Sequence, residues 1–218
     1  MKLASETSAD SDKLEGKMEP DIETNEKIGE IVRETIEQFC QEFMKNPYRC
    51  YTEHGIHALF YHDLLENIPE SLRFLRKEKD GKEICIVQKE YPMADSGGKS
   101  RRAHWDIAVL NPFLENAGEP WYDFLKLNSV VEFCLNEGEV HLKDDKERLM
   151  KAANIDHKYI VHFFRISNGE SRKDLKPNSA RIIPRGRFEE IMRGSGISSH
   201  YIMVDGTSRH ENQITKII

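Results

Sequence analysis

The sequence predicts a single α/β domain, with a mixed central β-sheet flanked by helices. Two patterns lead to this fold class. Apolar residues recur at helical spacing in residues 21–45 and 52–67, whereas short β-branched and alternating runs fill much of residues 83–166. The third observation is size: 218 residues, of which 38% are hydrophobic, give room for one medium domain with appendages rather than two full domains.

The elements follow from local patterns. Residues 1–20 hold few large apolar side chains and are predicted to form a disordered acidic leader before a domain over residues 21–218. The helix over residues 21–45 carries an apolar stripe that could serve a homodimer interface as well as the core, and both uses stay open. A second helix spans residues 52–67, with Thr52 as its predicted N-cap.

The rest of the chain alternates strands and helices. Strands are predicted over residues 83–91, 104–110, 129–135, 159–166 and 200–204. Helices are predicted over residues 143–153 and 188–193.

Composition excludes several classes of protein. No run approaches the ~18 apolar residues of a membrane span, and the N-terminus lacks the apolar segment of a signal peptide, so we expect neither a membrane nor a secreted protein. The net charge of −6 argues against a polycation that wraps nucleic acid non-specifically. Four scattered cysteines without CxxC spacing fit a reducing cytoplasm, where we expect the protein to reside.

Three carboxylates stand out against these patterns. Side chains alternate across a strand, so Asp106 and Glu132 each lie opposite the large apolar face of their own strand. Glu53 falls on the same line as the buried stripe of its helix. If the two strands are neighbours, Asp106 and Glu132 can converge, and two carboxylates that close would repel and raise a pKa unless a cation lies between them. Hard oxygen ligands favour Mg²⁺ or Mn²⁺ over zinc.

This arrangement resembles the PD-(D/E)XK superfamily, which has the restriction-endonuclease-like fold. The matching residues are Glu53 in TEHGIHALF, Asp106 in RRAHWDIAVL and Glu132 in SVVEFCLN, within a nuclease-like core of about residues 50–166. The resemblance implies metal-dependent hydrolysis of phosphodiesters in DNA or RNA. It implies that Asp106, Glu132 and the backbone carbonyl of Phe133 hold Mg²⁺ or Mn²⁺, with Glu53 assisting.

The chain departs from the family pattern at one position. The family motif usually ends in lysine, whereas this chain has Cys134, whose thiol cannot stabilise negative charge on a phosphate. Either Lys143 or Lys146 from the following helix replaces the lysine, with Lys146 the candidate catalytic residue, or the site is inactive. In the second case the chain is a module that binds nucleic acid or a protein partner. A third hypothesis is an interaction protein of unrelated α/β fold, whose acids lie apart.

A basic segment indicates where nucleic acid would bind. Residues 165–187 hold seven Lys or Arg against two Asp or Glu, a local excess of five positive charges. This segment leads into a basic C-terminal extension over residues 167–218. The predicted phosphate contacts are Arg101, Arg102, Arg172, Lys173 and Arg185. The alternative is that these charges neutralise the protein's own acidic surface.

Two other chemistries compete with the carboxylate site. Cys50, His54, His57 and His62 invite a zinc site, although their spacing matches no standard ligand set. Cys134 could act as a nucleophile with His104 or His141, but a buried strand cysteine usually packs as a small hydrophobe.

Overall fold

A computed structural model of the chain describes residues 22–76, 83–93, 104–112, 126–166, 182–205 and 213–217. The helices within these ranges are α1 (Ile22–Lys45), α2 (Glu53–Asn67), α3 (Glu139–Lys151) and α5 (Arg185–Met192), with a 3-10 turn, η1 (Glu70–Leu72). The strands are β1 (Phe74–Arg76), β2 (Glu83–Cys85), β3 (Val87–Pro92), β4 (His104–Leu110), β5 (Leu127–Leu135), β6 (Ile155–Ile166), β7 (Ser198–Asp205) and β8 (Gln213–Ile217).

The described strands form a six-stranded mixed sheet in the order β3-β4-β5-β6-β7-β8. The pairs β3–β4, β4–β5 and β7–β8 are antiparallel, whereas β5–β6 and β6–β7 are parallel. Parallel neighbours need a crossover connection, and α3 lies between β5 and β6 in the chain while α5 lies between β6 and β7. The predicted class, α/β with a mixed sheet flanked by helices, is therefore confirmed.

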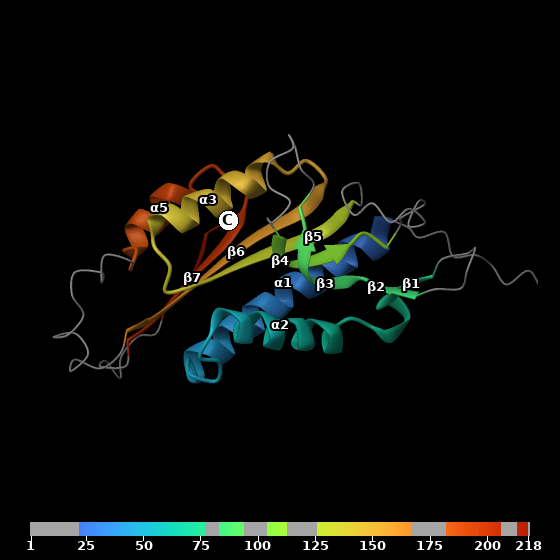
Figure 1. The fold of residues 1–218 in the computed structure, drawn as a ribbon, viewed down its shortest axis with the longest axis horizontal. Coiled ribbons are helices and arrows are strands. Elements are labelled where there is room, and N and C mark those ends of the chain that lie inside the picture. The colour runs from blue at the N-terminus through green and yellow to red at the C-terminus, as the bar shows by residue number, and fades with distance from the viewer. Residues whose placement is uncertain are drawn as a thin grey trace, which may run out of the picture.

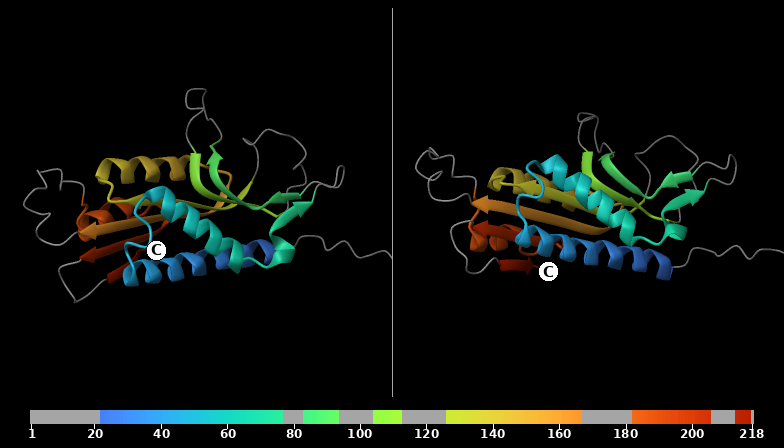
Figure 2. Two further views of the ribbon diagram at one scale, coloured as in Figure 1. Left: turned by 60° about the horizontal axis from the view of Figure 1, so that its bottom comes forward. Right: turned by 90° about the horizontal axis from the view of Figure 1, so that it is seen from below.

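The helices form two layers on opposite faces of the sheet. Figure 1 shows α3 and α5 above the sheet and α1 and α2 below it, and the views in Figure 2 show the long α1 running beside α2 across that lower face. The core of the lower layer is aromatic: the ring centroid of Phe133 on β5 lies 4.9 Å from that of Phe60 and 6.1 Å from that of Phe39. Burial of these rings holds both helices on β5.

The apolar stripe of α1 belongs to this core. Its buried residues, each at most 7% exposed in the single chain, are Ile28, Val32, Ile36, Phe39, Cys40 and Phe43. The structure thus assigns the stripe to the chain's own sheet. The possible homodimer interface over residues 21–45 depended on this apolar stripe being exposed, and the stripe is instead buried inside the chain.

Helix α2 begins as predicted. The side chain of Thr52 accepts a hydrogen bond of 3.1 Å from the Gly55 N–H, so Thr52 is the N-cap and Glu53 is the first helical residue. The cap thus places Glu53 in the first turn of α2.

The predicted strand over residues 83–91 is instead two strands that belong to different sheets. At Ile86 the chain passes between them: its N–H donates to Arg73 O and its carbonyl accepts from Leu110 N–H. Strand β2 pairs with β1, and β3 pairs with β4. Ile86 is fully buried, so the alternating apolar pattern continues through the break and hides it.

Several boundaries also differ from expectation. Helix α3 begins at Glu139, four residues before the predicted start, and β6 begins at Ile155 rather than Tyr159. Helix α5 runs over Arg185–Met192 instead of residues 188–193. The predicted leader over residues 1–20 and most of the basic segment lie outside the described residues. Within the described part of the chain, none of the helices combines the length and the hydropathy that a membrane span requires.

Candidate functional site

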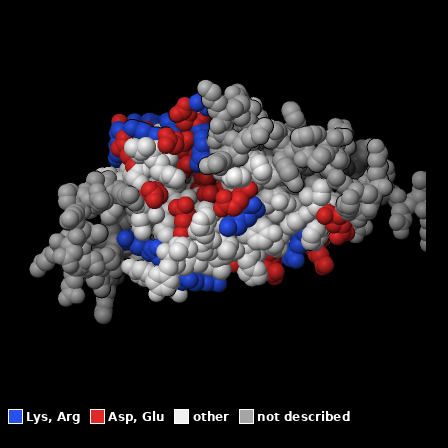
Figure 3. Space-filling model, in the orientation of Figure 1, with Lys and Arg blue, Asp and Glu red and all other residues white. Residues whose placement is uncertain are grey.

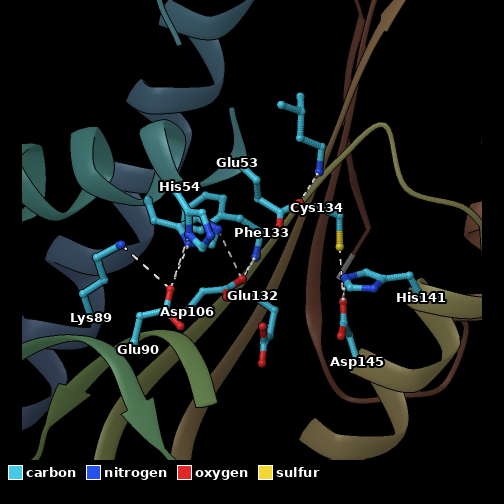
Figure 4. A network of polar contacts seen from close by, with 12 residues as sticks. Glu53, His54, Lys89, Glu90, Asp106, Glu132, Phe133, Cys134, His141 and Asp145 are labelled. Carbon is cyan, nitrogen blue, oxygen red and sulfur yellow. Dashed lines mark hydrogen bonds and ion pairs between the residues drawn. The ribbon is translucent and has the colours of Figure 1, made fainter. Parts of the chain in front are cut away.

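The site forms where β4 and β5 stop pairing. Their last paired residues are Ile107 and Val131. Beyond this point the N–H of Phe133 donates to Asp106 Oδ2 at 2.8 Å, and the N–H of Leu135 donates to Glu53 Oε2 at 3.0 Å. Two side-chain carboxylates, one from β4 and one from α2, thereby replace the strand partner that β5 has lost (Figure 4).

Asp106 and Glu132 form a buried carboxyl pair. Burial is the main cause that raises the pKa of Asp106 to about 6, while the hydrogen bonds from Phe133 N–H and from the Glu132 carboxyl oppose that rise. The pKa of Glu132 is raised well above its ordinary value, first by burial and then by the charge of Asp106. The raised pKa of Glu132 favours its protonated form when no cation is bound, with its carboxyl as the hydrogen-bond donor to Asp106.

Glu53 completes the acidic cluster. Burial raises the pKa of Glu53, against the lowering effect of the hydrogen bond from Leu135 N–H and the nearby His141. The charge of Glu53 in turn raises the pKa of Asp106, so the two groups lie within electrostatic range of each other. The structure thus brings together the three carboxylates that the sequence singled out, whereas the hypothesis of an interaction protein of unrelated fold expected them to lie apart.

The backbone of β5 adds a fourth oxygen. In an extended strand the N–H and C=O of one residue point to the same side. Because the N–H of Phe133 donates to Asp106, the carbonyl of Phe133 faces the same carboxylates. This places the predicted backbone ligand beside Asp106 and Glu132.

Lys146 is not brought to these carboxylates. Its Nζ donates to the carbonyl of Ile191 at 2.5 Å, in the contact between α3 and α5. Lys143 Nζ lies 2.5 Å from Glu139 Oε1 on its own helix. The expectation that either lysine supplies the missing motif cation is therefore not supported, because both face other partners.

The cation that lies beside this carboxyl pair is Arg148, a residue that the sequence analysis did not single out. Its Nη2 lies 3.5 Å from Glu132 Oε1 and also bonds Asp145, while its Cζ lies 6.0 Å from the centroid of the Trp105 ring. Arg148 lies three residues after Asp145, which is 1% exposed and itself lies three residues after the buried Leu142, so these residues share one side of α3. Helical spacing from these buried residues is the signal that could have separated Arg148 from its neighbours.

Cys134 occupies the position of the motif lysine and is neutral there. Its thiol donates to Asp145 Oδ2 at 3.2 Å, and burial raises its pKa well above the ordinary value. His141 Nε2 lies 3.2 Å from the same Asp145 oxygen. The thiol is thus held in its protonated form, which argues against the alternative of a cysteine nucleophile.

A pair of histidines borders the acids on the α2 side. His57 Nε2 lies 3.5 Å from Asp106 Oδ2, and its Nδ1 lies 3.8 Å from Glu90 Oε1. Burial is the main cause that lowers the pKa of His57 to about 4, so the ring is neutral at pH 7. His54 Nδ1 lies 3.6 Å from the same Glu90 oxygen. The sequence did not indicate Glu90, because it lies on a different strand in an ordinary alternating pattern.

Of the predicted nucleic-acid contacts, Arg101, Arg102, Arg172 and Lys173 lie outside the described residues. Arg185 is exposed at the start of α5, where its Nε donates to Glu189 Oε1 at 2.9 Å. Its described partner is therefore on its own helix and is not part of the carboxylate cluster. On the face shown in Figure 3, Lys and Arg alternate with acidic side chains over α3 and α5, and further acidic side chains gather in the middle of the face.

Comparisons with known proteins add no relative: no family model matches the chain, and neither a curated protein nor a solved structure matches it significantly. The functional argument therefore depends on the geometry of the site.

Proposed function

We propose that this chain is a divalent-metal-dependent nuclease of the PD-(D/E)XK kind that hydrolyses phosphodiesters in DNA or RNA. The observation that carries the proposal is the meeting of Glu53, Asp106 and Glu132, from α2, β4 and β5, where β4 and β5 part. The succession α2–β3–β4–β5–α3–β6, with acids on its helix, second strand and third strand, supports a restriction-endonuclease-like arrangement.

The donor set fits a hard divalent cation. Glu132 Oε1 is buried without a hydrogen-bond partner, and its ionic neighbour is Arg148 Nη2 at 3.5 Å, so the oxygen keeps the capacity to bind a hard cation. Asp106, Glu132 and the Phe133 carbonyl would supply oxygen ligands, as Mg²⁺ or Mn²⁺ prefer. When bound, the ion would lower the pKa of a water molecule and neutralise charge on the phosphate. Glu53, held by Leu135 N–H, would orient further water molecules.

Arg148 is our candidate for the missing lysine. A guanidinium is always charged and presents a planar set of donors that matches a phosphate. Arg148 Nε is buried without a hydrogen-bond partner, and Nη2 already reaches Glu132 Oε1 at 3.5 Å. We propose that Arg148 stabilises the developing charge on the phosphate, which the neutral Cys134 cannot do.

Cleavage of supercoiled plasmid and end-labelled RNA in Mg²⁺ or Mn²⁺ tests the proposal. Asp106→Asn and Glu132→Gln should each lower the rate by about 100-fold or more, because each removes a ligand charge while keeping the shape of the side chain. Asp144→Asn, an exposed acid on α3, is the matched control and should leave the rate unchanged. Arg148→Ala should lower the rate without removing metal binding, and Arg148→Lys should recover part of it.

Cys134 favours a second candidate, a catalytically inactive module that binds nucleic acid or a protein partner. This candidate predicts no cleavage, together with metal-independent binding of labelled DNA, RNA or partner that is equal in wild type and Asp106→Asn. Cleavage that persists unchanged in Asp106→Asn and Glu132→Gln would contradict the nuclease proposal directly.

A further inference from the structure

Beside the carboxyl pair, two histidines and a further carboxylate lie close to one another. His54 and His57 come from the first turns of α2, three residues apart and hence on the same side of the helix. Glu90 comes from β3. The ligand atoms of these three residues all lie within 4.8 Å of one another, and Figure 4 shows His54 and Glu90 on the side of the cluster away from Asp145.

The distances within this group match a coordination shell better than hydrogen bonds. Glu90 Oε1 lies 3.6 Å from His54 Nδ1 and 3.8 Å from His57 Nδ1, which is too long for hydrogen bonds. Two ligands of a tetrahedral zinc ion, each about 2.0–2.1 Å from the metal, lie about 3.3–3.4 Å apart. If the three ligand atoms moved slightly closer together, they would form one face of a tetrahedron around a zinc ion.

His57 provides an independent sign of a missing partner. Its side chain is only 2% exposed, yet neither of its ring nitrogens has a hydrogen-bond partner. Buried polar atoms are nearly always paired, because an unpaired one loses its hydration without compensation. An ion bound to Nδ1 would pair one nitrogen, and the other, Nε2, faces Asp106 Oδ2 at 3.5 Å. Metal-binding histidines commonly have a carboxylate on their second nitrogen.

The backbone at Glu90 is unusual in the same place. Its φ is 54°, in the left-handed region that residues other than glycine rarely adopt. The register between β3 and β4 passes from Lys89–Ile107 to Tyr91–Trp105, and Glu90 has no partner in it. This distortion interrupts the strand at the residue whose carboxylate meets the two histidines.

A second group of side chains that could ligate a metal, among the described residues, consists of Cys134, His141 and Asp145. There each donor already has a partner: the thiol and the His141 ring contact Asp145, and Arg148 neutralises it. That group is satisfied without an ion, whereas the group at His57 is not. Cys50 and His62, which the sequence had linked to His54 and His57, belong to neither group.

We propose that His54, His57 and Glu90 bind a zinc ion and leave its fourth position open. Two imidazoles and one carboxylate are a ligand set that zinc prefers and that the oxygen-only pair of Asp106 and Glu132 does not offer. The proposal does not depend on nuclease activity. Lys89 Nζ, 3.8 Å from Glu90 Oε1, competes for the carboxylate and would turn toward solvent when zinc binds.

Titration of the metal-stripped full chain with Zn²⁺ by calorimetry, and with Co²⁺ by visible absorption, tests this site. We expect one ion per chain with the absorption of a tetrahedral cobalt site. His54→Ala and Glu90→Gln should each weaken binding by at least about tenfold. Both side chains are exposed, so neither substitution threatens the fold. His62→Ala, an exposed histidine of the same helix, is the matched control and should bind as wild type does.

Two further variants separate this site from its neighbours. Glu132→Gln should abolish cleavage under the nuclease proposal and yet leave zinc affinity unchanged, so each proposal can fail without the other. His141→Ala should also leave zinc affinity unchanged. The proposal is overturned if the wild type shows no saturable zinc binding, if His54→Ala and Glu90→Gln bind as tightly as wild type, or if His141→Ala is the variant that loses the ion.

Discussion

Asp106 performs two tasks that conflict in the absence of a cation. As an acceptor for Phe133 N–H it closes the end of the β4–β5 ladder, which requires an oxygen at that position. As a buried carboxylate beside Glu132 it carries a charge that its surroundings disfavour, which is why its pKa rises to about 6. An amide keeps the first task and removes the second.

We therefore expect Asp106→Asn to raise the free energy of unfolding of the metal-free protein at pH 7.5, by on the order of 2 kcal/mol. The folded-state pKa lies above the unfolded value, so this group's contribution to stability is full below about pH 4 and is lost as pH rises through about 6. Urea denaturation in chelator measures the change. Asp106→Ala is the comparison, because it leaves Phe133 N–H without its acceptor and should be less stable than Asp106→Asn. An Asn variant less stable than wild type would contradict this account.

Among individual residues, the carboxylates of the site could be predicted from the sequence, but Arg148 and Glu90 beside them could not. Asp106 and Glu132 were recognisable because strand alternation puts each opposite an apolar face, a purely local property. Arg148 and Lys146 lie in one run of charges, and only the packing of α3 decides that Arg148 faces Glu132 while Lys146 faces Ile191. The position of the Glu90 carboxylate depends on a positive φ that its residue type does not predict.

At the scale of elements, helix α1 packs closely against strand β6 of the sheet at Gly29. A Cβ added there would lie 2.6 Å from Nε2 of the His157 side chain on β6, closer than any real contact. Glycine lowers the helix propensity of α1, but the absence of a Cβ leaves space for the His157 imidazole.

A double-mutant cycle tests that contact. Gly29→Ala should destabilise the wild type by about 1 kcal/mol or more, because the ring must move from its place. In the His157→Ala background the same substitution should stabilise the protein by up to about 1 kcal/mol, since only the helix-propensity gain remains. Urea unfolding of the four proteins gives the coupling energy. Equal effects of Gly29→Ala in both backgrounds would show that the ring does not limit the approach.

Element boundaries were predictable where a local signal fixes them. Thr52 caps α2 through its own side chain, and β4 coincides with the predicted strand over residues 104–110. The break at Ile86 was not predictable, since both of its hydrogen bonds go to residues that are distant in the chain or in another strand. Strands β1 and β8 are three and five residues long, too short to show alternation.

For the whole molecule, buried neutral histidines lower the stability in acid, in the opposite sense to the buried carboxyl of Asp106. His162 is fully buried between the sheet and α5, and burial is the main cause that lowers its pKa to about 3. The unfolded chain binds a proton at this residue near pH 6.5, and the folded protein does not. Stability from His162 is therefore full above about pH 6.5 and declines as pH falls toward about 3. His57 acts in the same sense.

We expect His162→Gln to reduce the loss of stability between pH 7 and pH 5, a loss whose slope is at most about 1.4 kcal/mol per pH unit for one histidine. Glutamine retains an amide donor for the carbonyl of Glu137, which lies 3.1 Å from His162 Nε2. Urea unfolding at several pH values gives both slopes. His62→Gln, at an exposed position, should retain the wild-type slope. If His162→Gln leaves the slope of unfolding free energy against pH unchanged, other titrating groups cause the loss of stability in acid.

The open end of the β4–β5 ladder has a practical consequence for observing the site. The amide protons of Phe133 and Leu135 are held by Asp106 and Glu53, one carboxylate each, rather than by a neighbouring strand. A nuclear magnetic resonance spectrum would therefore contain two backbone signals that report the state of two separate acids from inside a rigid strand. Such signals would distinguish an ion bound near Asp106 from one that engages Glu53, without any added probe.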